Sequence, residues 1–356
     1  MSEHPHQPRP WIVILGGFLG SGKTSLILAA ARLLEKRGLR CAVILNDQCS
    51  ELVDTRHVEI EGVLAREVTG GCFCCRFSEL QSMIGELRTR AVDVIFAEPV
   101  GSCTDISATV FRPLREEFDL YRVAPFTVLV DPKRAASLNN EDADSPLAFL
   151  FQKQLDEADL VCMTKADLYP DAASLPGVAQ RFLSAKTGQG VSEWLDEILS
   201  GSYDAGKTTL EIDYEQYARA EAALAWMNLS FTFEPAVPVS PALASGPLFD
   251  GLHDALTEAG ISIAHLKMIN RSPTGWLKVA VCANGEEPAV EGNLDASPAG
   301  RHELLVNLRA RGDAAQVRKL VEWQLQQLEG RKLDMHFNCF SPAAPKPERR
   351  VPRAMP

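Results

Sequence analysis

The sequence lacks any apolar run near the roughly 18 residues that a helix needs to cross a bilayer. It also lacks an excess of positive charge, because 36 Lys and Arg stand against 47 Asp and Glu and leave a formal net charge of -11. A general nucleic-acid binder needs a basic surface to meet the phosphates. We therefore expect neither a membrane nor a nucleic acid among the partners of this chain.

A signal peptide is not indicated, because the apolar residues 11–16 run directly into a glycine-rich motif. We expect a cytoplasmic protein. Its nine cysteines are then reduced thiols, buried or metal-binding, rather than a disulfide framework. The chain has 356 residues, 46% of them hydrophobic, which is enough for two globular domains.

Residues 17–24, with the sequence GFLGSGKT, fit the P-loop pattern G-x-x-x-x-G-K-[ST]. A strand pattern precedes the motif and a helix pattern follows it, which is the context that a P-loop requires. Glycines let the backbone turn tightly, so that its N–H groups and the start of the helix face the phosphates. The sequence therefore predicts a nucleoside triphosphate site. The expected binding residues are Gly17, Gly20, Ser21, Gly22, Lys23, Thr24 and Ser25.

Three side chains are expected to act on the phosphates. Lys23 should contact the β- and γ-phosphates, and the Thr24 hydroxyl should bind Mg²⁺. Glu98 ends the β-rich run of residues 92–98 at the edge where a parallel sheet faces its nucleotide, which is the position of a Walker B acid. Asp47 is the other acid expected near Mg²⁺ or the attacking water. Either acid could instead be a solvated loop residue, Asp47 more readily than Glu98.

Strand and helix patterns alternate from the P-loop to about residue 186, which predicts an α/β fold with a doubly wound, mostly parallel sheet. The pattern then changes to mixed strands with two helices, which predicts a smaller α+β domain. The tail is rich in Pro, Lys and Arg without periodicity, so we expect it to be disordered. The predicted organisation is a flexible leader at 1–10, a P-loop nucleotide-binding domain at 11–205, a helical connector at 206–228, the α+β domain at 229–330 and the disordered tail at 331–356.

The sequence TKAD at residues 164–167, at the end of a strand pattern, indicates which base is bound. The Asp167 carboxylate can accept paired hydrogen bonds from guanine N1–H and its 2-amino group, and adenine offers no such donors. The Lys165 side chain can lie along the purine face. Thr164 stands where GTPases usually have Asn, which removes an amide that braces the loop. A second base-contacting loop is expected at Ser184, Ala185 and Lys186, and together these features favour GTP.

Residues 72–75, CFCC, place three thiols within four residues, after two glycines and before a helix start. Arg76 and the helix N-terminus favour the thiolate form, which binds metal. Three thiolates suit Zn²⁺ or another borderline-soft divalent ion and leave one coordination position open, as an ion that is handed on would need. We therefore expect Cys72, Cys74 and Cys75 to be metal ligands. A buried inert cysteine run, a redox pair, or a site with only two ligands remains an alternative.

The other cysteines mostly lie in apolar runs and are expected to be core residues. Cys103 is one of these, and Cys49, in the loop after Asn46, is an exception. His336 and Cys339 form a weaker candidate metal pair near the C-terminus, because two ligands alone bind weakly.

Together these motifs resemble the CobW-like GTPases, P-loop GTPases of metallocentre assembly that include HypB and UreG. The resemblance covers about the first 200 residues, through GGFLGSGKTS, GGCFCC, Glu98 with Gly101, TKAD and SAKTG. It implies a GTP hydrolase that uses Mg²⁺ and delivers Zn²⁺ or Co²⁺ to a client metalloprotein or metallocofactor enzyme. It also implies a small α+β second domain. A nucleotide-dependent homodimer is left open.

The chain departs from the family pattern at two loops. Where the family reads N-E-F-G-E, residues 46–50 read NDQCS, followed by Glu51 and Asp54, and E-T-x-G becomes EPVG at residues 98–101. We expect loss of the γ-phosphate to rearrange the loops carrying Asp47 and residues 72–75 and to loosen the ion. The alternatives are a P-loop kinase or other NTPase acting on a small molecule, which would prefer ATP, and a non-catalytic metal-binding scaffold.

Overall fold

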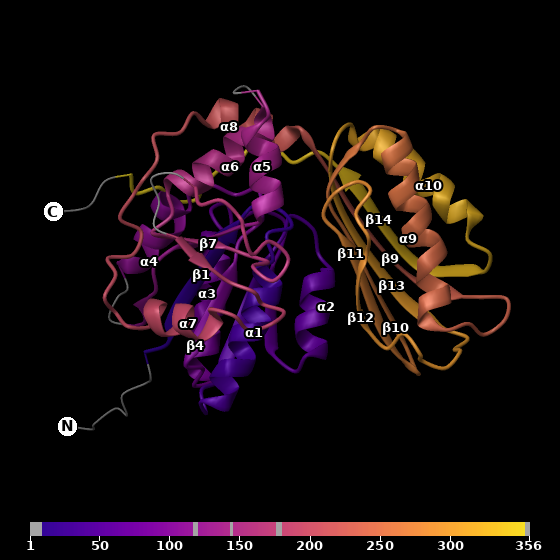
Figure 1. Cartoon of the computed structure of the whole chain (residues 1–356), viewed down its shortest axis with the longest axis horizontal. Helices are drawn as coiled ribbons and strands as arrows, with labels where there is room; N and C mark the ends of the chain where they lie inside the picture. The colour runs from indigo at the N-terminus through magenta and orange to yellow at the C-terminus, as the bar shows by residue number, and fades with distance from the viewer. Residues whose placement is uncertain (1–8, 117–119, 143–144, 176–179, 353–356) are drawn as a thin grey trace. The chain divides into compact units, whose positions relative to one another are not determined.

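The structure is a computed structural model that describes residues 9–116, 120–142, 145–175 and 180–352 (Figure 1). Most of the expected leader, residues 1–8, lies outside the described residues. The chain divides into two compact units. The first unit contains Met1–Gln48, Val58–Tyr217 and Pro345–Pro356, and the second contains Cys49–His57 and Ala218–Ala344. Within the described part of the chain, no helix combines the length and apolarity that a membrane span requires.

The first unit is built on a parallel sheet with the strand order β3-β2-β4-β1-β6-β7-β8, and β5 pairs with β1. The strands are β1 (Trp11–Gly17), β2 (Cys41–Asn46), β3 (Leu64–Val68), β4 (Val94–Glu98), β5 (Arg122–Val123), β6 (Thr127–Val130), β7 (Leu160–Met163) and β8 (Gln180–Phe182). The helices that lie between β1 and β8 in the sequence are α1 (Lys23–Lys36), α2 (Val53–Ile60), α3 (Phe77–Thr89), the π-helical turn η1 (Ser107–Phe111), α4 (Arg112–Arg115), α5 (Pro132–Asn139) and α6 (Pro146–Asp156). Two further helices, α7 (Val191–Ile198) and α8 (Tyr214–Ala222), follow β8. This arrangement confirms the predicted α/β fold class.

The central strands are continuous apolar runs because both faces of a parallel sheet are covered. All residues of β4, including Glu98 at its end, are buried. On α1 the buried residues recur at helical spacing, including Leu26, Ala30 and Leu34. Strands β1 and β4 are neighbours, and the connection after β1 runs toward β2 on one side while the connection after β4 runs toward β5 and β6 on the other. Open α/β sheets bind their ligands at such a point, outside the carboxyl ends of the strands.

The second unit contains an antiparallel sheet with the order β12-β11-β10-β13-β9-β14. Its elements are β9 (Leu224–Glu234), α9 (Pro241–Glu258), β10 (Ser262–Ser272), β11 (Gly275–Val281), β12 (Ala289–Gly292), β13 (His302–Arg311), α10 (Ala314–Gln327) and β14 (Arg331–Phe340). Both helices lie on the same face of the sheet (Figure 1), and residues such as Leu252 and Val321 join the strand residues in one core. This agrees with the predicted smaller α+β domain, while the boundaries drawn from the sequence remain a proposal.

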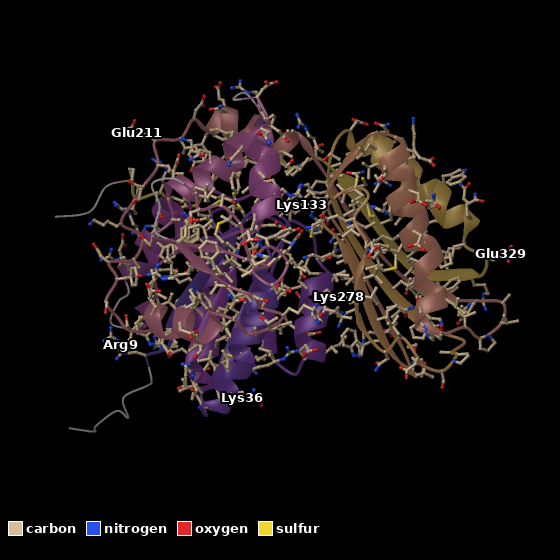
Figure 2. The ribbon with its side chains drawn as sticks, in the orientation of Figure 1. Arg9, Lys36, Lys133, Glu211, Lys278 and Glu329 are labelled. Carbon is tan, nitrogen blue, oxygen red and sulfur yellow. The ribbon has the colours of Figure 1, made fainter. Side chains whose placement is uncertain are left out.

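Charged side chains of the second unit are not all at the surface. Glu329 projects outward in Figure 2, as Lys36 does in the first unit, whereas Lys278 is buried with its Nζ atom 2.8 Å from Glu291 and 3.0 Å from His57 Nδ1. A buried lysine needs such partners, because an unpaired charge inside a protein is costly.

The C-terminal part of the chain is ordered where disorder was expected from residue 331. Residues 331–340 form β14, which pairs with β9 at the edge of the second sheet. Residues 345–352 return to the first unit, where the Arg350 guanidinium lies 2.7 Å from the buried carboxylate of Asp105 and also donates to the carbonyl oxygen of Leu210. The amino-acid composition of the tail did not predict this order, because its basic residues pair with particular carboxylates and carbonyl oxygens instead of remaining solvated.

We expect Arg350→Ala to release this segment. The substitution leaves the Asp105 carboxylate with only the Tyr214 hydroxyl, 2.6 Å away, among the side-chain partners described here, and loss of a partner by a buried acceptor costs about 1–3 kcal/mol. Trypsin should then cleave after Arg349 about tenfold faster. Arg331→Ala, which breaks an exposed pair with Glu234, is the matched control. Equal cleavage rates in the two variants would contradict the prediction.

Stability should depend on pH through Glu157, which follows α6. Its carboxyl is fully buried and accepts hydrogen bonds from Thr104 Oγ1 and Ser107 N–H, both at 3.0 Å. Burial raises the pKa of Glu157 from 4.5 to about 8. The folded protein therefore keeps a proton that the unfolded chain releases, and the free energy of unfolding falls as pH rises between these two pKa values.

Glu157→Gln should remove this dependence, because the amide keeps the shape of the side chain without ionising. In the wild type we expect a slope of up to about 1.4 kcal/mol per pH unit, and Glu215→Gln, an exposed acid on α8, should keep it. Urea unfolding between about pH 5 and pH 8 measures the slopes. A Glu157→Gln protein with the wild-type slope would show that another group is responsible.

Candidate nucleotide and metal site

The P-loop joins β1 to α1 through glycines that no other residue could replace without strain. Gly17, Gly20 and Gly22 have φ angles of 132°, 82° and 92°, values that glycine adopts readily and other residues rarely do. A Cβ atom at Gly17 would lie 2.4 Å from the carbonyl oxygen of Leu129. The start of α1 has no side-chain cap at Gly22. Its N–H groups can therefore point at an anion.

The side chains of the loop fit a phosphate with Mg²⁺. Thr24 Oγ1 donates to Glu98 Oε2 at 2.9 Å, so the hydroxyl and the carboxylate predicted as magnesium ligands lie together. Lys23 Nζ donates to the carbonyl oxygen of Gly17 at 2.8 Å. Ser21 Oγ is buried and has no hydrogen-bond partner among the described residues. A phosphate oxygen would satisfy this hydroxyl, because buried polar groups are normally paired.

The two predicted base-contacting loops lie side by side. Ser184 Oγ donates to Asp167 Oδ1 at 2.6 Å, and the Ala166 N–H donates to the Leu183 carbonyl oxygen at 3.1 Å. Thr164 does brace a loop, because its hydroxyl donates to the carbonyl oxygen of Ser21 at 2.9 Å. The sequence analysis expected this loop to lose a bracing hydrogen bond because Thr164 replaces an Asn, and that expectation was wrong. The Thr164 hydroxyl bonds directly to the P-loop in place of the amide.

Asp131 is a residue that the sequence analysis missed. Asp131 directly follows β6 and is the N-cap of α5, where its carboxylate accepts the Lys133 N–H at 2.9 Å. The same carboxylate lies 2.5 Å from Lys165 Nζ. Asp followed by Pro after a buried strand is a helix-start signal that could have indicated it. A cavity of about 620 Å³ opens beside this loop, lined by residues of α5 and of the segment 168–175, among them Leu168 and Tyr169.

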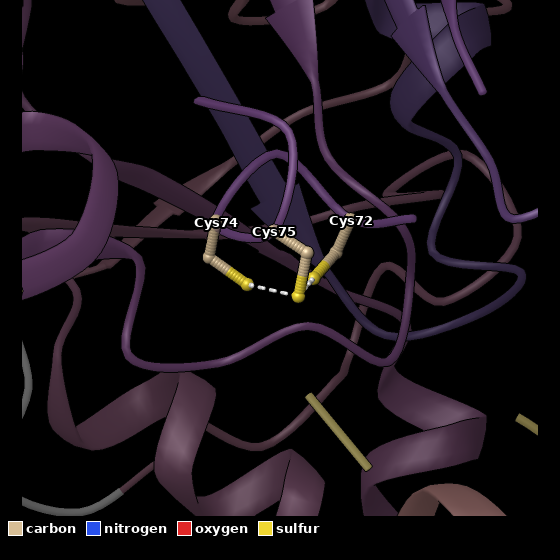
Figure 3. A group of neighbouring side chains, drawn as sticks. All are labelled: Cys72, Cys74 and Cys75. Carbon is tan, nitrogen blue, oxygen red and sulfur yellow. Dashed lines mark hydrogen bonds between the residues drawn. The ribbon is translucent and has the colours of Figure 1, made fainter. Parts of the chain in front are cut away.

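The three predicted thiols gather at one point (Figure 3). The Sγ atom of Cys75 lies 3.2 Å from that of Cys72 and 3.7 Å from that of Cys74, and all three lie within 4.8 Å of one another. The N–H groups of Cys75 and Arg76 both donate to the Cys72 carbonyl oxygen, which folds the segment into a turn. Cys72 and Cys74 are buried and Cys75 is half-buried. The donor set and spacing fit a soft divalent ion.

The cluster has a fourth thiol as neighbour. Hydrogen bonds from the thiols of Cys103, Cys74 and Cys75, in that order of effect, hold the pKa of Cys72 well below its usual range. The same Cys103 thiol is the largest influence that raises the pKa of Cys74, and Cys72 raises that of Cys75 to about 11. The thiols therefore shift one another's pKa in opposite directions, with that of Cys72 lowered and those of Cys74 and Cys75 raised.

Asn46, at the end of β2, holds the cysteine turn in place. Its Nδ2 donates to the carbonyl oxygens of Val68 at 2.9 Å and Gly71 at 2.8 Å, and its Oδ1 accepts the Phe73 N–H at 2.7 Å. A polar residue ending a buried strand was the signal for this role. The next residue, Asp47, donates its backbone N–H to the Val68 carbonyl oxygen, and its place at Mg²⁺ stays a prediction.

The chain also covers the cluster from its C-terminal end. The Lys346 N–H donates to Cys75 Sγ at 3.1 Å, and the Glu348 N–H donates to the Cys74 carbonyl oxygen at 2.9 Å. The Glu348 carboxylate accepts the Ser78 N–H at 2.8 Å in the first turn of α3. These contacts join residues some 270 positions apart, so nothing in the local sequence indicates them.

Other candidates lie elsewhere. Asp54 pairs with Lys267 at 2.6 Å within the second unit, and although burial opposes it, the Lys267 charge holds the pKa of Asp54 well below its usual range. His336 and Cys339 do not form a metal pair. His336 lines one surface hollow of the sheet, whereas Cys339 donates its thiol to the carbonyl oxygen of Ala314 at the start of α10.

Comparison with known proteins assigns this chain to a family. Residues 11–192 match the model of the CobW/HypB/UreG nucleotide-binding domain. The chain is 28% identical to the zinc chaperone YjiA of Escherichia coli over 168 residues, which is 46% of this chain and 52% of that protein. It is 31% identical to the zinc chaperone CobW of Pseudomonas aeruginosa over 193 residues, 44% of this chain and 48% of that protein. The matches thus span about half the length of these relatives.

Two solved structures are similar at lower levels. One is HypB from Helicobacter pylori in complex with nickel, with 17% identity and a TM-score of 0.39 over 54% of this chain and 86% of that one. The other is Zn(II)-bound YjiA GTPase from E. coli, with 14% identity and a TM-score of 0.31 over 90% of this chain and 99% of that one. The family model, in contrast, covers residues 11–192 of 356, just over half of the chain. The protein therefore belongs to the CobW/HypB/UreG family.

Proposed function

We propose that this protein is a GTP-hydrolysing metallochaperone. It binds a divalent ion, zinc or cobalt, at Cys72, Cys74 and Cys75 and delivers it to a client metalloprotein or metallocofactor enzyme in the cytoplasm. The observation that carries the proposal is that the phosphate loop and the thiol cluster lie in one unit, joined by the loop after β4. The relatives named zinc chaperones favour zinc as the ion.

The nucleotide chemistry follows from the residues around the P-loop. Lys23 and the P-loop N–H groups stabilise the negative charge of the β- and γ-phosphates, and Thr24 and Glu98, with Asp47, hold Mg²⁺. A magnesium ion bound by these residues would supply positive charge to offset the charge that develops on the transferred phosphoryl group. Glu98 or a neighbouring residue orients the attacking water in this scheme, which its hydrogen bond with Thr24 beside the P-loop supports. Asp167 and Lys165, with residues 184–186, select guanine.

The loop after β4 is the element that can transmit the nucleotide state to the thiols. Glu98 at its start bonds to Thr24, and Gly101 lies so close to the P-loop that a Cβ atom there would be 2.7 Å from Leu19 Cδ2. Cys103 in the same loop contacts the thiol cluster. Loss of the γ-phosphate would shift this loop and weaken the hold on the ion, an order–disorder switch. A nucleotide-dependent homodimer is compatible with this scheme.

Lys23→Ala should abolish GTP hydrolysis, with a loss on the order of 100-fold or more in kcat, because the charge on the transferred phosphate loses its main partner. Phosphate release from GTP measures the effect, and ATP as competitor measures base selectivity. Lys36→Ala, on the exposed end of the same helix, should leave turnover unchanged. Preference for ATP over GTP would instead indicate a small-molecule kinase or other NTPase.

Zinc affinity should differ between the complexes with a GTP analogue and with GDP, since the proposed switch changes the thiol site. Competition with a chromophoric chelator measures both dissociation constants. Cys74→Ala should weaken zinc binding in both states by on the order of 100-fold while nucleotide affinity stays the same, and Cys41→Ala is the control thiol. Equal zinc affinities in the two nucleotide states would falsify the coupling.

A further inference from the structure

The segment 345–352 belongs to the same unit as the thiol cluster and contacts it at two points. Its Lys346 N–H donates to Cys75 Sγ at 3.1 Å, and its Glu348 N–H donates to the Cys74 carbonyl oxygen at 2.9 Å. Cys75 is half-buried, whereas the other two thiols of the cluster are buried. The segment therefore lies against the cluster at its least buried thiol.

The sequence of this segment suits an extended chain with few hydrogen-bond donors. It begins with PKP at residues 345–347. A proline has no N–H and holds φ at about −65°, and the residue before a proline is restricted to extended conformations. Lys346 thus supplies the one backbone N–H of these three residues, and this donor is the group that meets Cys75 Sγ.

Polar contacts attach the rest of the segment. The Glu348 carboxylate accepts the Ser78 N–H at 2.8 Å and the Ser78 hydroxyl at 2.6 Å, and the Arg350 guanidinium lies 2.7 Å from the Asp105 carboxylate. Two backbone groups also take part, at 2.8 Å and 2.7 Å: the Val351 N–H donates to the Ala108 carbonyl oxygen, and the Pro352 carbonyl oxygen accepts the Thr209 hydroxyl. These contacts fix the segment to α3, to η1 and to the chain between α7 and α8.

The attachment does not involve a buried side chain of the segment. Each residue from 345 to 352 is exposed or half-buried. Exposed polar contacts contribute little free energy individually, and segments with few buried apolar contacts open locally without global unfolding. The segment can therefore leave the thiol cluster while the parallel sheet stays folded.

We propose that the segment 345–352 is a gate that controls the rate at which the ion enters and leaves the thiol cluster. This proposal rests on the proposed metallochaperone function and adds a control step to it. While the segment is docked, it occupies the side of the cluster at Cys75, and a client ligand reaches the ion only after the segment has detached. A client thiol then loses its proton to solvent and bonds to the ion, while Cys75 leaves the ion and takes up a proton from solvent, with no redox change.

A gate differs from a simple stabilising contact in its effect on rates. The dissociation constant is the ratio of the release rate to the uptake rate. Because the docked segment obstructs both directions, its removal should speed release and uptake together and leave the dissociation constant nearly unchanged. A contact that only stabilises the loaded site would instead slow release alone, so that its removal lowers the zinc affinity.

Transfer of zinc from the loaded full-length protein tests the gate. Glu348→Ala combined with Arg350→Ala removes two side-chain attachments of the segment and leaves the cysteines unchanged. Release to an excess of the chelator pyridylazoresorcinol, followed by stopped flow under reducing conditions, should be about tenfold faster in this variant. The dissociation constant should change by less than about threefold. Glu329→Ala with Arg331→Ala, an exposed acid and arginine at the same spacing, is the matched control and should keep the wild-type rate.

Three results would count against the gate. Equal release rates in the two double variants, with zinc bound to both, would overturn the gate and leave the metallochaperone proposal intact. A dissociation constant that rises in step with the release rate would overturn it as well. A wild type that binds no zinc would overturn the metallochaperone proposal and the gate together.

Alkylation of the metal-free, reduced protein gives a second measurement that does not need the ion. Peptide mass spectrometry should show that N-ethylmaleimide labels Cys75 about tenfold faster in the variant with Glu348→Ala and Arg350→Ala than in the wild type. Cys282, a half-buried thiol of the second unit, should react at the same rate in both. Thermal unfolding checks that the variant is folded, and Arg350→Ala alone serves if it is not. Unchanged labelling of Cys75 in a folded variant would overturn the gate.

Discussion

The hydrogen bond between Thr24 and Glu98 is the contact on which the functional part of this structure depends. It joins the first turn of α1 to the end of β4. The phosphate loop precedes α1, and the loop that contains Cys103 follows β4. Because β1 and β4 are adjacent parallel strands, their carboxyl ends meet at one edge of the sheet. The hydroxyl and the carboxylate are thereby held where a magnesium ion and a nucleotide phosphate would share them.

The thiol cluster is built on the same edge. Asn46 ends β2, which pairs with β4, and its side-chain amide fixes the turn that contains Cys72. Cys103 approaches the cluster from the loop after β4. The CFCC loop follows β3 and the loop that contains Cys103 follows β4, and β2, which ends at Asn46, lies between these two strands in the sheet. A change in the position of either loop would alter the distances between the thiols, and this is the physical basis of the coupling between ion and nucleotide that we propose.

Burial makes this cluster sensitive to its surroundings. Adjacent thiols in a region of low dielectric oppose one another's ionisation, and their hydrogen bonds lower the pKa of Cys72 and raise those of Cys74 and Cys75. A divalent cation removes this conflict, because it stabilises every thiolate at once. The segment 345–352 adds one N–H donor to a sulfur, from Lys346 to Cys75 Sγ, and a second N–H, that of Glu348, donates to the Cys74 carbonyl oxygen.

Sequence alone was sufficient for the P-loop, the parallel sheet, Glu98 beside Thr24, the loop of Asp167 beside Ser184, and the compact CFCC turn. These features depend on local patterns and on the rule that parallel strands align their carboxyl ends. Only the tertiary structure decided the bracing by Asn46 and Thr164, the opposite directions of His336 and Cys339, and the return of Arg350 to Asp105. The reason is physical: strand order and a long-range chain return determine which distant residues meet, and neither leaves a periodic signal in the amino-acid sequence.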